Sequence, residues 1–97
     1  LMQANPQIEK GERRRAPFEA LLAQITTLAR EFDRPVLLAH GDEHEYFVDH
    51  PLPAAPKLTR VQTFGSPAVH WIEVRVDPAQ PQVFSFRPHH VSLPGDA

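Results

Sequence analysis

The sequence lacks several features that would assign it to a functional class. It has no cysteine, which excludes disulfides, thiolate metal ligands and cysteine nucleophiles and leaves the redox compartment undecided. It has no excess of positive charge, since 10 basic and 12 acidic residues give a net charge of −2 with histidine neutral. A protein that binds the nucleic-acid backbone carries a clear basic excess. We therefore expect no nucleic-acid partner.

Long apolar runs and several catalytic motifs are also missing. No run approaches the roughly 18 apolar residues of a membrane span. Leu1-Met2-Gln3 lacks the basic and then apolar stretch of a secretory signal. There is no Gly-x-Ser-x-Gly motif, no Walker loop and no pair of carboxylates at catalytic spacing. We expect neither a membrane partner nor a serine hydrolase.

Proline, in contrast, is abundant, and 11 prolines indicate many short elements. We predict a single partial domain over 1–97. It comprises an irregular arm (1–16), a helix (17–33), strands with a metal-like loop at 40–44 (36–87) and a polar tail (88–97).

The helix is the clearest of these elements. Pro17 suits a first helical turn, and Pro35 ends the helix because a residue before proline avoids the α region. The apolar residues recur at helical spacing on one stripe, which is typical of core packing: Phe18, Leu21, Leu22, Ile25, Leu28, Ala29 and Phe32.

The strands change character along the chain. Residues 36–39 form a continuous apolar run after the helix, which predicts a buried strand parallel to strands that precede it. Such a unit normally has a strand before its helix, so we expect the chain to be part of something larger. Period-two alternation then predicts strands near 44–49, 58–64, 69–77 and 83–87, paired mostly antiparallel. The predicted fold is α+β, with one amphipathic helix packed on a mixed, mostly antiparallel sheet.

The loop after the buried strand concentrates chemically active side chains. His40, Asp42 and His44 lie within five residues, and Gly41 permits a sharp turn between them. Imidazole and carboxylate together suit Zn, Mn or Fe, and ligands converge at the carboxyl ends of strands in α/β sheets. Two interpretations stay open: a metal or phosphate site, or a polar turn with idle histidines.

Three other histidines are predicted to be structural or idle. We expect His70 to be hydrogen-bonded and to face the core or the edge of a sheet. His89 and His90 are expected to bind nothing. The arginine run at 13–15 is predicted to be a solvated arm.

Several segments together resemble the C-terminal portion of bacterial calcineurin-like metallophosphoesterases. The resemblance covers most of 1–87 and rests on four runs: Pro35-Val36-Leu37-Leu38-Ala39-His40-Gly41-Asp42-Glu43-His44, Asp49-His50-Pro51-Leu52, Thr59-Arg60-Val61-Gln62-Thr63-Phe64-Gly65-Ser66-Pro67 and Val69-His70-Trp71-Ile72-Glu73-Val74.

The resemblance implies part of a four-layer α/β/β/α sandwich with a two-metal site that hydrolyses phosphomonoesters or phosphodiesters. His44 matches the second histidine of the family's Gly-His-x-His motif, and Asp42 stands where the first should be. His40 lies just before it and offers a substitute. Gln3 stands where an earlier motif has a histidine before a proline. The family's Asp-x-His, Gly-Asp and Gly-Asn-His motifs do not occur in the chain.

Two functions stay open after the sequence analysis. In the first, the chain is the C-terminal segment of a metal-dependent phosphoesterase-like hydrolase. It is inactive in isolation, its partner is the missing N-terminal portion, and Mn, Fe or Zn is the cofactor of the parent family. In the second, the chain is a small non-catalytic α+β module that covers an apolar sheet face by forming a homo-oligomer.

Overall fold

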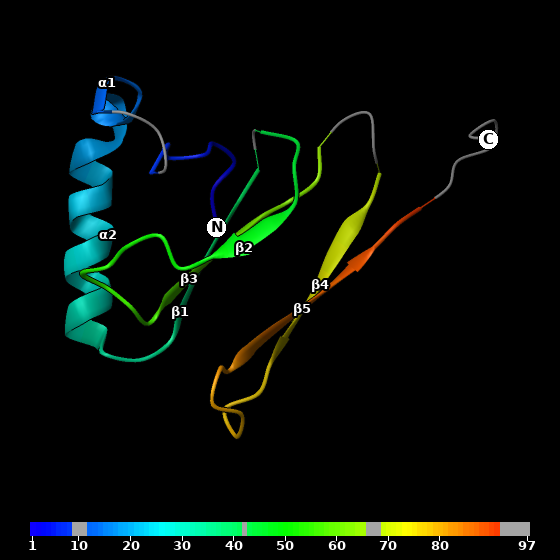
Figure 1. Ribbon diagram of the computed structural model, residues 1–97. Helices are drawn as coiled ribbons and strands as arrows, with labels where there is room; N and C mark the ends of the chain where they lie inside the picture. The colour runs from blue at the N-terminus through cyan, green and yellow to red at the C-terminus, as the bar shows by residue number, and fades with distance from the viewer. Residues whose placement is uncertain (9–11, 42, 66–68, 92–97) are drawn as a thin grey trace.

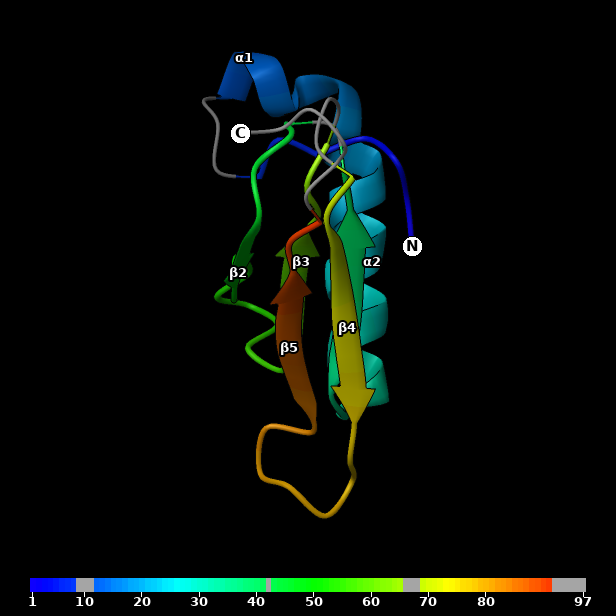
Figure 2. The same ribbon diagram turned by 90° about the vertical axis from the view of Figure 1, so that its right-hand side faces the viewer.

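The computed structural model describes residues 1–8, 12–41, 43–65 and 69–91, and these form three layers (Figure 1). One long helix covers one face of a three-stranded sheet, and a two-stranded hairpin lies over the opposite face (Figure 2). The elements in chain order are α1 (Glu12–Arg15), the 3₁₀ turn η1 (Ala16–Phe18), α2 (Glu19–Phe32), β1 (Val36–His40), β2 (Phe47–Asp49), β3 (Leu58–Gln62), β4 (Trp71–Val76) and β5 (Phe84–His89). The α+β prediction is confirmed, but two sheets replace the predicted single sheet.

Helix α2 buries only part of the predicted apolar stripe. Its residues Leu22 and Ala29 are buried. Leu21, Leu28 and Phe32 belong to the same predicted stripe but are exposed, so the prediction of core packing is wrong for them. The helix ends at Asp33, which adopts a left-handed backbone with φ 52° and donates its N–H to the Ala29 carbonyl at 3.1 Å. Pro17 lies in the η1 turn, ahead of α2. The predicted arm at 1–16 contains the short helix α1, so it is not irregular throughout.

The three-stranded sheet has the order β1-β3-β2. Strand β1 pairs parallel with β3, and β2 pairs antiparallel with β3 on its other side. The described parallel partner of β1 therefore follows it in the sequence, because the chain passes through β2 at the edge and returns through the middle as β3. The predicted preceding strand is not among the described strands, but Met2 and Gln3, which precede β1, hydrogen-bond along its end.

Strands β4 and β5 form the second sheet. Their antiparallel register places Ile72 opposite Pro88, Val74 opposite Phe86 and Val76 opposite Phe84. Strand β3 already has a partner on each edge, so its backbone groups are not free to pair with a further strand. Strands β4 and β5 pair with each other, and their hairpin covers the face of the first sheet that α2 does not reach (Figure 2).

The core lies between α2 and the first sheet. Ala29, Leu38, Ala55 and Leu58 form its buried centre. Every residue of β3 is buried, and side chains alternate between the two faces of a strand. Arg60 and Gln62 consequently share the helix-facing side with Leu58, which makes this side unusually polar. None of the described helices is both long enough and apolar enough to cross a membrane.

Candidate functional site

The predicted loop follows the carboxyl end of β1, beside the N-terminal segment. Met2 donates its N–H to the Ala39 carbonyl at 2.9 Å, and Gly41 donates its N–H to the Gln3 carbonyl at 2.9 Å. Both segments run in the same direction past one another. The structure thus makes neighbours of Gln3 and the 40–44 loop, the two places that the sequence resemblance assigns to metal motifs.

His40 is the last residue of β1, and its side chain is only 1% exposed. Its Nδ1 lies 3.0 Å from the Gly41 carbonyl oxygen, to which an Nδ1–H can donate. Its Nε2 is buried and makes no hydrogen bond within the described part of the chain. In the neutral imidazole with Nδ1 protonated, Nε2 carries a free lone pair. The ring is therefore closed off from solvent but retains an unused acceptor.

His44 has a different environment. It is exposed, and its backbone is left-handed with φ 63°. Gly41, which the sequence suggested as the turning point, has no positive φ, and a Cβ there would meet the Gln3 oxygen at an ordinary 3.5 Å. The left-handed residue of the described loop is His44, so the freedom predicted for Gly41 is not used. The left-handed residue that turns the chain here is therefore His44, and not Gly41.

Asp42 lies outside the described residues. Within the described ranges, no three His, Asp or Glu side chains are grouped so that they could hold a metal ion. Of the residues of this loop that the structure describes, His44 carries an exposed imidazole and His40 a buried one. These two imidazoles alone do not make up a metal site.

Sequence reasoning missed a buried amide pair behind the loop. The Asn5 amide donates to the Gln62 Oε1 at 3.1 Å, and the Gln62 amide donates to the Glu45 carbonyl at 2.7 Å. Both side chains are fully buried. Gln62 thus joins the N-terminal segment to the loop. The sequence offered one signal for this pair. Gln62 lies four residues after Leu58 in the predicted strand, so period-two alternation places this polar side chain on the same face as a buried leucine.

An exposed contact joins the same two segments. The Gln7 side-chain amide donates to the Glu43 carboxylate at 3.1 Å and to the Asn5 carbonyl at 3.3 Å. The Gln7 N–H donates to the Asn5 side-chain oxygen at 2.8 Å. The N-terminal segment therefore holds the loop at Gly41, Glu43 and, through Gln62, at Glu45.

A cluster of aromatic rings lies between the two sheets, close to the loop. The Phe64 ring stacks on Tyr46 at 5.3 Å between centroids and meets His70 and His90 edge-on at 5.1 and 5.4 Å. His70 Nδ1 accepts the Val91 N–H at 2.9 Å. The prediction that His70 is a hydrogen-bonded histidine is confirmed. His90 was expected to be idle, but it packs in this cluster.

His89 stacks flat on Trp71, with ring centroids 4.0 Å apart and planes at 7°. Its Nε2 lies 3.4 Å from a Glu73 carboxylate oxygen. The Arg75 guanidinium, hydrogen-bonded to Glu73 at 2.9 Å, lowers the pKa of that carboxyl, and His89 adds to the effect. These contacts give His89 a role in holding the hairpin.

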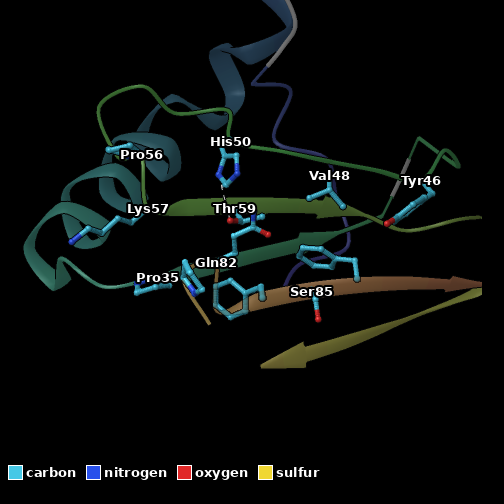
Figure 3. Close-up of a pocket in the computed structure, with 12 residues that line it drawn as sticks. Pro35, Tyr46, Val48, His50, Pro56, Lys57, Thr59, Gln82 and Ser85 are labelled. Atoms are coloured by element: carbon cyan, nitrogen blue, oxygen red, sulfur yellow. Dashed lines mark hydrogen bonds between the residues drawn. The ribbon is translucent and has the colours of Figure 1, made fainter. Parts of the chain in front are cut away.

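A cavity of about 600 Å³ separates the first sheet from the hairpin (Figure 3). Its walls include Tyr46, Val48 and Phe84. His50 points toward Thr59, with Nδ1 3.4 Å from the Thr59 hydroxyl and 3.3 Å from the Leu58 carbonyl. The hairpin thus covers this sheet face without filling the space beneath it.

Comparison with known proteins gives no relative for this chain. No family model matches it, and neither a curated protein nor a solved structure matches it.

Proposed function

We propose that this chain is the C-terminal segment of a metal-dependent phosphoesterase-like hydrolase and that it is inactive in isolation. The observation that supports the proposal best is the contact between the two motif places. The Gly41 N–H donates to the Gln3 carbonyl at 2.9 Å, so both places lie at the carboxyl end of β1. That end of a sheet is where ligands gather in α/β proteins.

In this proposal His44 supplies an accessible imidazole ligand and Asp42 a carboxylate ligand. His40 holds the turn through the Gly41 carbonyl, and its buried Nε2 keeps an acceptor available beneath the loop. The metal supplies the usual Lewis-acid polarisation of a phosphoryl oxygen and a nucleophilic hydroxide. The remaining ligands come from the preceding portion of the protein.

Metal titration tests this function. We expect Zn²⁺ or Mn²⁺ to bind the chain weakly, because fewer than the usual three or four protein ligands converge. Calorimetry should show that Asp42→Ala/His44→Ala abolishes the binding and that His89→Ala/His90→Ala preserves it. Binding should also weaken in acid, because imidazole must be neutral to ligate. Binding that survives the loop double substitution would contradict the proposal.

Hydrolysis assays test the second half of the proposal. With added Mn²⁺, the chain should not turn over chromogenic phosphomonoesters or phosphodiesters at ordinary enzyme rates of about 1–10³ s⁻¹. The reason is that the clamp on the attacking and leaving oxygens needs a second metal. Turnover in that range that disappears in His44→Ala would show that the chain is complete as an enzyme.

One observation favours the alternative, a non-catalytic module that self-associates. Leu21, Leu28 and Phe32 form an apolar stripe on α2 and are 38%, 56% and 59% exposed. Their spacing of seven and four residues is that of a helix–helix seam, which a second copy of α2 would match. Sedimentation should then show a dimer in the wild type and only the 11.0 kDa monomer in Leu28→Glu/Phe32→Glu. A monomeric wild type would exclude this alternative.

A further inference from the structure

His44 has a conformation that its own sequence neighbours do not explain. A φ of 63° is uncommon for a residue with a side chain, although histidine adopts it more often than most residues do. An exposed imidazole in an open loop would otherwise sample several rotamers. A metal ligand needs a fixed direction, which other side chains usually provide.

Gly65 makes the closest approach to this histidine. A Cβ atom placed on Gly65 would lie 2.5 Å from Cγ of the His44 ring and 3.0 Å from His44 Cα. Real Cβ atoms essentially never come as close as this to a ring carbon, and the distance to Cα is tighter than most real Cβ contacts. The His44 ring therefore occupies the space that any other residue at position 65 would fill. Here glycine is required for space, since its φ is not positive.

The position of Gly65 is fixed by the residue before it. Phe64 contacts three rings, those of Tyr46, His70 and His90, and so joins the first sheet to the hairpin. These ring contacts hold the residue next to Gly65, and so oppose a shift of Gly65 away from His44. On the other side of His44, the Gln62 amide holds the Glu45 carbonyl at 2.7 Å.

We propose that Gly65 is a positioning residue for His44: held by Phe64, it forms a seat that sets the direction of the His44 imidazole and thereby its capacity to bind a divalent metal ion. The metal-binding part of this inference rests on the proposed function. The seat itself rests on the contacts alone.

A double-mutant cycle separates the seat from a general effect on folding. The variants are Gly65→Ala, His44→Gly and the double substitution, with thermal unfolding as the readout. We expect Gly65→Ala to lower Tm by about 5 °C or more in the wild-type background. In the His44→Gly background the loss should be much smaller, because the ring is gone and glycine accepts a left-handed backbone.

Gly41→Ala serves as the matched control. Its Cβ meets only ordinary contacts at 3.5 Å, so its effect on Tm should be the same with and without the His44 side chain. If Gly65→Ala alone does not fold, a folded double variant Gly65→Ala/His44→Gly supports the seat. If neither variant folds, the proposal of a seat is overturned. An equal loss of Tm in the two backgrounds also overturns it.

Metal titration then tests the consequence for binding. Zn²⁺ affinity, measured by calorimetry on folded protein, should fall about tenfold in Gly65→Ala, as for other groups that orient a ligand. Unchanged affinity would overturn the positioning role. If the wild type binds no Zn²⁺ or Mn²⁺, the proposed function fails, whereas the unfolding cycle still decides whether the seat exists.

Discussion

Arg60 and Asp49 form a two-pronged ion pair across β3 and β2. Arg60 Nε lies 2.8 Å from Asp49 Oδ1, and Nη2 lies 2.5 Å from Oδ2. The arginine side chain is 1% exposed, whereas that of the aspartate is 40% exposed. The guanidinium also lies over the Phe47 ring, 4.8 Å from its centroid. One strand thus places a full positive charge inside the helix-facing layer.

We predict that Asp49→Asn lowers the free energy of unfolding by about 2 kcal/mol, because a buried cation loses a bidentate charge-assisted contact. Urea denaturation followed by Trp71 fluorescence measures the loss. Glu73→Gln is the matched control, since it removes a pair on the outer surface and should have a much smaller effect. Equal losses in the two variants would show that burial of Arg60 does not matter.

A second prediction concerns pH and the end of α2. The Lys57 ammonium donates a hydrogen bond to the Asp33 carboxylate at 2.8 Å and lowers the pKa of that carboxyl below its ordinary value of 3.8. A depressed folded-state pKa adds stability above the unfolded-state pKa, and this stability is lost as pH falls through the folded-state pKa.

We therefore expect Asp33→Asn to unfold at a lower Tm than the wild type at pH 7, with the difference disappearing in acid below the ordinary pKa of aspartate. Asparagine accepts the left-handed backbone at this position, so the variant isolates the charge. Lys57→Gln should give a similar loss, and the double variant should lose little more. A difference that persists undiminished into strong acid would be inconsistent with this ion pair.

A third prediction concerns the turn that leads into β5. Val83 has φ 62°, and the Phe84 N–H donates across it to the Gln82 carbonyl at 2.6 Å. A three-residue turn with positive φ at its centre is the rare, strained form, and a β-branched residue suits it poorly. We predict that Val83→Asn raises the free energy of unfolding by about 1 kcal/mol.

Chemical denaturation tests this, with Val76→Asn as the control. Val76 is exposed on a regular strand, so asparagine there should be slightly destabilising. The strain account is refuted if both substitutions destabilise equally.

Local patterns predicted the elements of this fold and the mostly antiparallel pairing of its later strands, but not the division into two sheets. The stripe that includes Leu22 and Ala29 identified α2, and the run at 36–39 identified β1, because burial imposes a period on neighbouring residues. In the first sheet β1 and β2 occupy both edges of β3, while β4 and β5 pair with each other, and no local period encodes this division into two sheets.

The candidate loop was predictable in composition but not in geometry. Clustered His40, Asp42 and His44 marked it, and the structure places His40 inside and His44 outside. The contacts that shape it join residues far apart in the chain. Gly65 meets His44 across 21 positions, and Asn5 meets Gln62 across 57. Such pairings depend on the finished fold, so a single sequence carries no visible signal for them.

The Asn5–Gln62 bond also has a kinetic consequence. Closing a loop of 57 residues costs more chain entropy than closing the short hairpin of β4 and β5. The bond joins the N-terminal segment to β3, so the loop that it closes contains α2 and β1. During refolding the hairpin should form early and the N-terminal segment should dock last. The loop at 40–44 therefore acquires its final shape at the end of folding, after the sheet that carries it is complete.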